Sequence, residues 1–227
     1  EIYRMLNILT LRNYIQANKK TDIYNLTYKL LEISFNQQPV KNLIQKVIPR
    51  MKELAQLCNQ SLHLSIYSAG KLLVVAQVDS PSAFNYAVAA GSTFDLLETS
   101  SGRVLLSFQS ESERKRRLER RKLFIKLEKK NKLSSIELKK IENKFSSKII
   151  FEILNNGYEV VESLQINGIT NISVPVLDYN NNAIAAITIP FVSRINSKED
   201  LNIKKTTKLL LRHSEKISKF FGFKKND

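Results

Sequence analysis

The sequence contains little of what catalytic and metal sites are built from. Its 227 residues include one cysteine, Cys58, and two histidines, His63 and His213. A single cysteine excludes an internal disulfide and a cysteine-based zinc cluster. Two histidines leave little material for a metal site or a Ser-His-Asp triad, and neither has an acidic or serine partner in a recognisable motif. We therefore expect a protein that is not an enzyme and that uses no metal or cofactor.

Proline, glycine and long apolar runs are also scarce. The chain has five Pro and six Gly, while 43% of its residues are hydrophobic, which excludes a fibrous or disordered chain. No stretch approaches the roughly 18 consecutive apolar residues of a membrane helix. The length suits one large domain or two small ones. We expect a cytoplasmic protein that does not bind membranes.

Acidic residues are strongly outnumbered by basic ones. The chain has 36 Lys and Arg against 21 Asp and Glu, a formal net charge of +15, which favours a polyanionic partner. Residues 110–148 alone carry fifteen Lys and Arg against six Glu. The run at 114–122 suggests nucleic-acid binding. Apolar residues at helical spacing in the same segment instead predict a helix with one buried face and one solvated charged face, and we favour that interpretation.

The first 35 residues have the pattern of a helix, a hairpin and a second helix. Apolar residues recur at helical spacing over 1–13, and strands at 14–16 and 23–26 flank a polar turn at 17–22. A helix followed by a hairpin with a basic tip is the second half of a winged helix-turn-helix. Because the chain starts with Glu1 inside this helix, we expect the first helices of such a domain to lie upstream.

The remaining residues predict an antiparallel sheet flanked by helices. After a break at 36–39, we expect helices at 43–58, 100–108, 111–131, 135–156 and about 200–221, and strands at 62–67, 72–77, near 83–90, and at 158–162, 172–178 and 183–191. Cys58 falls on the apolar stripe of the first of these helices and is expected in the core. The fold class is α+β, with domains at 1–35 and 36–227.

Four stretches resemble the IclR family of bacterial transcription regulators. They comprise residues 2–9 with 12–15, residues 23–32, residues 91–94 with 100–106, and the C-terminal group 157–158, 167–168, 174–176 and 183–189. The family has a winged helix-turn-helix followed by an effector-binding domain of GAF-like fold. The resemblance covers essentially the whole chain. It implies a partial winged helix-turn-helix, a GAF-like domain, and assembly as a homodimer or homotetramer.

The resemblance implies double-stranded DNA as one partner. A recognition helix lies in the major groove, where its exposed side chains contact base edges. In this chain that position is taken by Tyr3, Arg4 and Asn7, while Lys19 and Lys20 at the hairpin tip are placed to contact phosphate. Without the resemblance, Arg4 is more simply an ordinary surface arginine.

The resemblance also implies a small-molecule effector, an organic or aromatic acid. The effector-binding candidates, carried over by position, are Tyr86, Phe94, Ser100, Ser101, Asn171 and Thr188. Ser100 and Ser101 start a predicted helix, where free N–H groups suit a carboxylate; the alternative is that Ser100 is only an N-cap and Phe94 only a core residue.

Two departures from the family bear on the class of effector. Family members often have Gly and Ala at the positions of Ser100 and Ser101, and Val161 stands where a polar contact is expected. The second function we consider is a stand-alone module that senses a small molecule and oligomerises without binding DNA.

Overall fold

The computed structural model describes residues 1–18, 20–35, 37–83, 85–128, 145–193 and 201–224. The chain divides into two compact units, Glu1–Gln45 and Lys46–Asp227. Among the described helices, none is long and apolar enough to cross a membrane.

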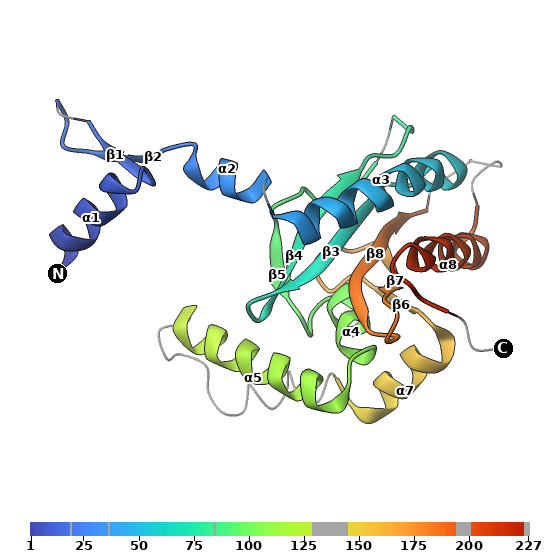
Figure 1. Cartoon of the computed structure of the whole chain (residues 1–227). Coiled ribbons are helices and arrows are strands. Elements are labelled where there is room, and N and C mark those ends of the chain that lie inside the picture. The colour runs from blue at the N-terminus through green and yellow to red at the C-terminus, as the bar shows by residue number, and fades with distance from the viewer. Residues whose placement is uncertain (19, 36, 84, 129–144, 194–200, 225–227) are drawn as a thin grey trace. The chain divides into compact units, whose positions relative to one another are not determined.

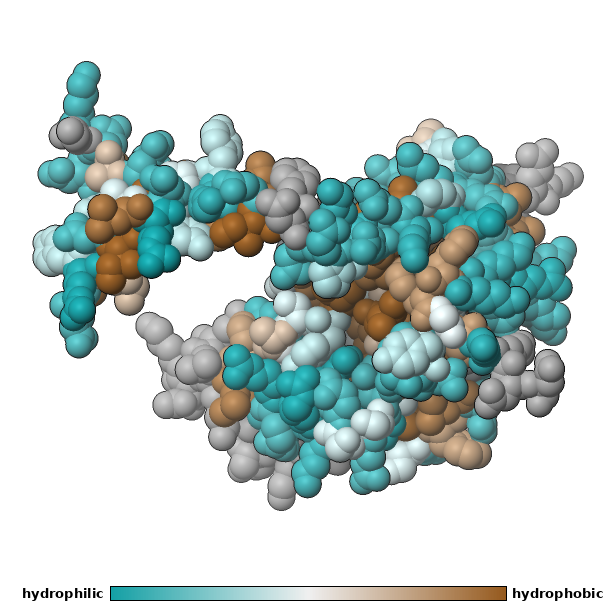
Figure 2. Space-filling view, viewed as in Figure 1, coloured by the Kyte–Doolittle hydropathy of each residue, from teal (hydrophilic) through white to brown (hydrophobic). Residues whose placement is uncertain are grey.

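The first unit follows the predicted order of a helix, a hairpin and a helix. It contains α1 (Ile2–Leu11), β1 (Ile15–Ala17), β2 (Tyr24–Leu26), α2 (Lys29–Phe35) and the start of α3 (Gln38–Cys58). The two strands pair antiparallel, with Gln16 opposite Asn25. No residue of α1 is buried, and Figure 2 shows apolar side chains on the surface of this unit. The unit therefore forms no hydrophobic core along α1.

The second unit is built on one six-stranded antiparallel sheet. Its strands are β3 (Leu62–Ser68), β4 (Lys71–Val78), β5 (Thr93–Asp95), β6 (Glu159–Glu162), β7 (Ile169–Leu177) and β8 (Ala183–Val192). Their order across the sheet is β5-β4-β3-β8-β7-β6, so the sequence-distant strands β3 and β8 are neighbours at its centre. This sheet with its helices confirms the predicted α+β class.

Helices cover both faces of this sheet (Figure 1). One face is covered by α3 and α8 (Ile203–Lys219), which lie side by side: Lys46 of α3 donates to the carbonyl of Phe220 at 3.2 Å. The other face is covered by α4 (Ser100–Ser107), with α5 (Glu111–Glu128) and α7 (Ser147–Asn156) packed outside it. Three residues of α4, Val104, Leu105 and Leu106, join Leu72 of β4 and Ala186 of β8 in a buried apolar cluster. Cys58 is buried at the end of α3, as predicted.

The strand predicted near 83–90 is wrong. The chain leaves the sheet after β4 and forms no regular structure at 86–89. Pairing with β4 resumes only where Gly91 donates to the carbonyl of Val74 at 2.8 Å and Val74 donates to that of Ser92 at 2.9 Å, and β5 follows. The backbone N–H of Ala90 bonds instead to the side chain of Gln77. The result is a long β4–β5 loop rather than a strand.

The helix boundaries near the gaps also differ from the prediction. The helix expected at 135–156 is wrong at its start, because α7 begins only at Ser147 with Ser146 as its N-cap and residues 145–146 are not helical. Residues 129–144 lie outside the described part of the chain. Gly157, at φ +79°, ends this helix as expected. The last helix begins at Ile203 with Asn202 as its N-cap, and the expected capping segment at 197–200 lies outside the described residues.

Candidate functional site

A row of polar residues crosses the central sheet from β4 to β6. Gln77 lies opposite His63, His63 opposite Thr188, Thr188 opposite Ser173, and Ser173 opposite Glu159. Directly opposite residues in antiparallel strands point to the same face of a sheet. This polar row therefore occupies one face, the face that α4 covers.

The start of α4 is bonded to this row through hydroxyl groups. The Oγ of Ser100 lies 2.7 Å from that of Ser173, which in turn lies 2.7 Å from Oγ1 of Thr188. All three side chains are buried. The Thr99 side chain caps the helix by accepting the N–H of Gly102 at 3.2 Å. The hydroxyl chain fixes the position of the first turn of α4 over β7 and β8.

A buried ion pair fixes the next turn of α4. Nε of Arg103 donates to Oε1 of Glu159 at 2.8 Å, and its Nη1 donates to the carbonyl of Leu97 at 2.8 Å. Burial raises the pKa of Glu159, while the bond to Arg103 opposes that rise. The pair joins α4 to the edge strand β6 and to the segment that precedes the helix.

The α4 cavity lies between this row, the start of α4 and the β4–β5 loop. Its lining residues are His63, Leu72, Tyr86, Val88, Phe94, Thr99, Ser100, Ser101, Ser163, Gln165, Asn171 and Thr188. All six effector-binding candidates are among them, although they come from the β4–β5 loop and from β5, α4, β7 and β8. Their role in binding stays a prediction. The free volume is about 30 Å³, room for one or two water molecules.

The α4 cavity is polar but carries no fixed charge. None of the lining residues in the described part of the chain is Asp, Glu, Lys or Arg. His63 is 6% exposed, and burial lowers its pKa to about 4, so the imidazole is neutral at pH 7. Its Nδ1 is buried with no hydrogen-bond partner in the described part of the chain. Because a buried polar atom without a partner is costly, a ligand that bonded this nitrogen would remove that cost.

The structure bears on the two alternative interpretations, that Ser100 is only an N-cap and that Phe94 is only a core residue. Ser100 is not the N-cap, because Thr99 takes that position. Ser100 and Ser101 instead occupy the first turn of α4, where backbone N–H groups have no partner within the helix. Phe94 packs against the buried apolar cluster and also lines the cavity. Sequence analysis missed His63, since nothing in its local sequence shows that β3 pairs with β8.

The candidate DNA-contacting residues are accessible in the first unit. Tyr3, Arg4 and Asn7 are exposed on α1, with Tyr3 82% exposed. Lys20 is exposed in the turn between β1 and β2, where its N–H donates to Oδ1 of Asn18 at 3.0 Å. Lys19 lies outside the described residues. The part of the chain that is described thus leaves these side chains open to a partner, and their contact with DNA stays a prediction.

The basic run on α5 is only partly a solvated face. Arg114 donates to the carbonyls of Leu106, Ser107 and Gln109 at 2.9–3.0 Å and so caps the end of α4. The guanidinium of Arg117 lies 4.6 Å from the centre of the Tyr67 ring. Three arginines of this helix therefore face inward, the third being Arg121, which bonds to Asp95 at 3.0 Å. The outer surface of α5 is hydrophilic, as Figure 2 shows, and there the prediction is confirmed.

Comparison with known proteins agrees with this architecture. Residues 38–219 match the family described as "Bacterial transcriptional regulator IclR C-terminal". The HTH-type transcriptional regulator KdgR of Escherichia coli (strain K12) is 25% identical over 228 residues, which cover 98% of this chain and 80% of KdgR.

Two solved structures share the fold. A putative IclR transcriptional regulator from Silicibacter sp. TM1040 superposes with a TM-score of 0.71 at 15% identity, covering 98% of this chain and 84% of that one. An IclR homolog from Microbacterium hydrocarbonoxydans, complexed with 4-hydroxybenzoate, superposes with a TM-score of 0.67 at 15% identity, covering 96% of this chain and 83% of that one.

Proposed function

Because the chain belongs to the IclR family of bacterial transcriptional regulators, we propose that residues 1–35 contact operator DNA and that an acid bound in the α4 cavity modulates this contact. The observation that carries the proposal is the convergence of the six effector candidates, together with the unbonded His63, on one cavity. The relatives are transcriptional regulators, which are not enzymes.

An organic or aromatic acid suits the chemistry of the α4 cavity. Its carboxylate would accept hydrogen bonds from the first-turn N–H groups of α4, where the helix dipole favours negative charge. His63 and Asn171 offer further hydrogen-bonding atoms on the facing strands. Since no lysine or arginine lines the cavity, apolar contact with Leu72 and Phe94 must supply much of the affinity. The bound 4-hydroxybenzoate of a relative supports an acid of this kind.

Binding of such an acid requires the α4 cavity to widen. Ligand pockets typically measure about 300–1,000 Å³, whereas this cavity has about 30 Å³ free. Tyr86 and Val88 supply one wall from a loop without regular structure, and loops move more easily than sheet strands. We expect the β4–β5 loop to move outward on binding and to become more ordered.

DNA recognition is proposed for α1 and the β1–β2 hairpin. The exposed Tyr3, Arg4 and Asn7 would contact base edges in the major groove, and Lys20 would contact phosphate. A homodimer or homotetramer would place two such units on two half-sites. The acid would then alter operator affinity by a coupling free energy of roughly 1–3 kcal/mol.

The test measures binding of the protein to DNA from upstream of its own gene, with and without benzoate and pyruvate. Arg4→Ala should abolish sequence-selective binding, and Thr188→Val should abolish the response to acid while leaving DNA binding intact. Lys208→Ala, an exposed change on α8, is the matched control. Selective DNA binding that survives Arg4→Ala would refute the proposed contact. Acid binding without any selective DNA binding would instead support the stand-alone sensor.

A further inference from the structure

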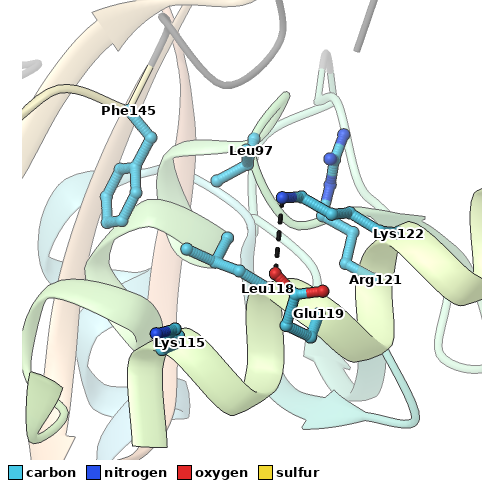
Figure 3. A pocket seen from close by; sticks show the side chains of 7 residues that line it. All are labelled: Leu97, Lys115, Leu118, Glu119, Arg121, Lys122 and Phe145. Atoms are coloured by element: carbon cyan, nitrogen blue, oxygen red, sulfur yellow. Dashed lines mark hydrogen bonds and ion pairs between the residues drawn. The ribbon is translucent and has the colours of Figure 1, made fainter. Parts of the chain in front are cut away.

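A second and larger cavity lies between α5 and the body of the second unit. This α5 cavity has a volume of about 290 Å³, and none of the described residues lines both it and the α4 cavity. Leu97, Leu118 and Phe145 form its apolar wall, as Figure 3 shows. Leu97 and Phe145 are buried in the apolar cluster that α4 shares with the sheet. The wall is therefore a fixed part of the core.

The rim of the α5 cavity is basic. Among the described residues, Lys115, Arg121 and Lys122 line it together with a single acid, Glu119. Lys115 is exposed on α5. Lys122 lies 3.4 Å from Glu119 in a partly exposed pair, a kind that contributes little to stability. In Figure 3 the Lys122 side chain extends toward Leu97 and Leu118.

Arg121 adds a buried guanidinium to this rim. Its side chain is 2% exposed, with Nε donating to Oδ1 of Asp95 at 3.0 Å. Its Nη2 lies 2.8 Å from Oδ2 of Asp95 but makes no well-directed hydrogen bond in the described residues. Buried donors normally have directed partners. The α5 cavity thus combines an apolar wall with a buried guanidinium that is paired with Asp95.

The two cavities differ in the charge of the residues that line them. Of the lining residues that the structure describes, none is charged in the α4 cavity, whereas three of the seven in the α5 cavity are cations. We propose that the α5 cavity is a second small-molecule site, which binds an amphipathic carboxylate. The carboxylate lies between Lys115 and Lys122, where it competes for Lys122 with the groups that this lysine already contacts, Glu119 among them. The hydrocarbon part packs on Leu118 and Phe145. Bonds between ammonium and carboxylate groups are stronger than neutral ones.

The segment before α4 is shared by both sites. Leu97 lines the α5 cavity, and Thr99 lines the α4 cavity two residues later. The carbonyl of Leu97 also accepts the bond from Arg103 that helps to fix α4. An occupant of the α5 cavity therefore contacts the same segment that shapes the α4 cavity, from its opposite side.

The experiment compares hexanoate with hexanamide by calorimetric titration of the protein at pH 7. Hexanoate should bind about tenfold more tightly than the amide, because only the acid gains the two ammonium contacts. The double variant Lys115→Gln/Lys122→Gln should lose this preference. Lys204→Gln/Lys208→Gln, with two exposed lysines on α8, should keep it. Equal binding of acid and amide, or no binding of hexanoate, would overturn the second site.

A further variant separates this proposal from the proposed function. Thr188→Val alters the α4 cavity alone and should leave hexanoate binding unchanged. If hexanoate binding is lost in Thr188→Val but kept in the double lysine variant, the acid occupies the α4 cavity. That result would overturn the second site and would leave the proposed function supported.

Discussion

The buried neutral His63 makes the stability of the protein depend on pH in a defined direction. An imidazole has an ordinary pKa near 6.5, and burial lowers that of His63 to about 4 in the folded protein. Between these two values the unfolded chain binds a proton that the folded chain does not. The free energy of unfolding must then fall as the pH falls from 6.5 to 4, and its dependence on His63 must fade as the pH rises above 7.

The expected size of this effect follows from the two pKa values. At pH 7 the unfolded imidazole is mostly neutral, so His63 contributes almost nothing to the difference between the states. At pH 5 the unfolded imidazole is almost fully protonated, whereas the folded one is about nine-tenths neutral. Linkage gives a loss of about 2 kcal/mol between pH 7 and pH 5. No charged residue lines the α4 cavity to offset it.

The assay is urea unfolding of the protein and of His63→Gln, followed by circular dichroism at pH 7, 6 and 5. The variant should lose about 2 kcal/mol less than the unchanged protein over this range. Burial also lowers the pKa of His213, but that residue is present in both proteins and its contribution cancels. Identical pH dependence in the two proteins would refute the reasoning, because it would mean that His63 titrates normally in the folded state.

Three further predictions concern packing and charge. Gly70→Ala should destabilise the protein by about 2–3 kcal/mol in urea unfolding, because φ is +95° and the new Cβ would lie 2.9 Å from a backbone oxygen of α5. The control Gly91→Ala, at φ +90° with open space around it, should cost only about 1 kcal/mol. Equal losses of stability in the two variants would contradict the close packing at Gly70. Arg121→Met should lower the free energy of unfolding by about 2 kcal/mol, less than for a fully buried pair because Asp95 is 21% exposed. Adding Asp95→Asn should recover part of that loss. An unchanged free energy of unfolding in Arg121→Met would show that the pair contributes nothing to stability. Lys20→Ala should lower the slope of log affinity for DNA against log salt by about 1, and an unchanged slope would exclude its phosphate contact.

The spacing of apolar and polar residues was enough to predict most of the helices and strands. Five of the six strands of the sheet, all except β5, and the helix ended by Gly157 follow from patterns within a few residues. The expected strand near 83–90 failed because strand formation there depends on a partner: β4 pairs with β5 instead, only after the turn at Gly91. The sequence of residues 83–90 by itself does not show whether a neighbouring strand will pair with them.

The candidate site was predictable only in part, for the same reason. The resemblance named residues that do converge on the α4 cavity, but His63 enters it only because β3 pairs with β8, far away in the sequence. The inward arginines of α5 were missed because a periodic pattern marks charged residues as outward-facing. Arg114 faces inward because the carbonyls at the end of α4 need donors.

In the polar row across the central sheet, folding stability and the proposed ligand binding favour different side chains. Hydroxyl and imidazole groups at Ser173, Thr188 and His63 occupy positions where aliphatic side chains would pack, and one nitrogen there has no partner. Replacing such groups by apolar residues of similar volume is often neutral or stabilising in a protein interior. We therefore expect a laboratory selection for thermal stability alone to find substitutions in this row. If the α4 cavity binds the proposed acid, the selected variants would be more stable proteins that no longer bind it.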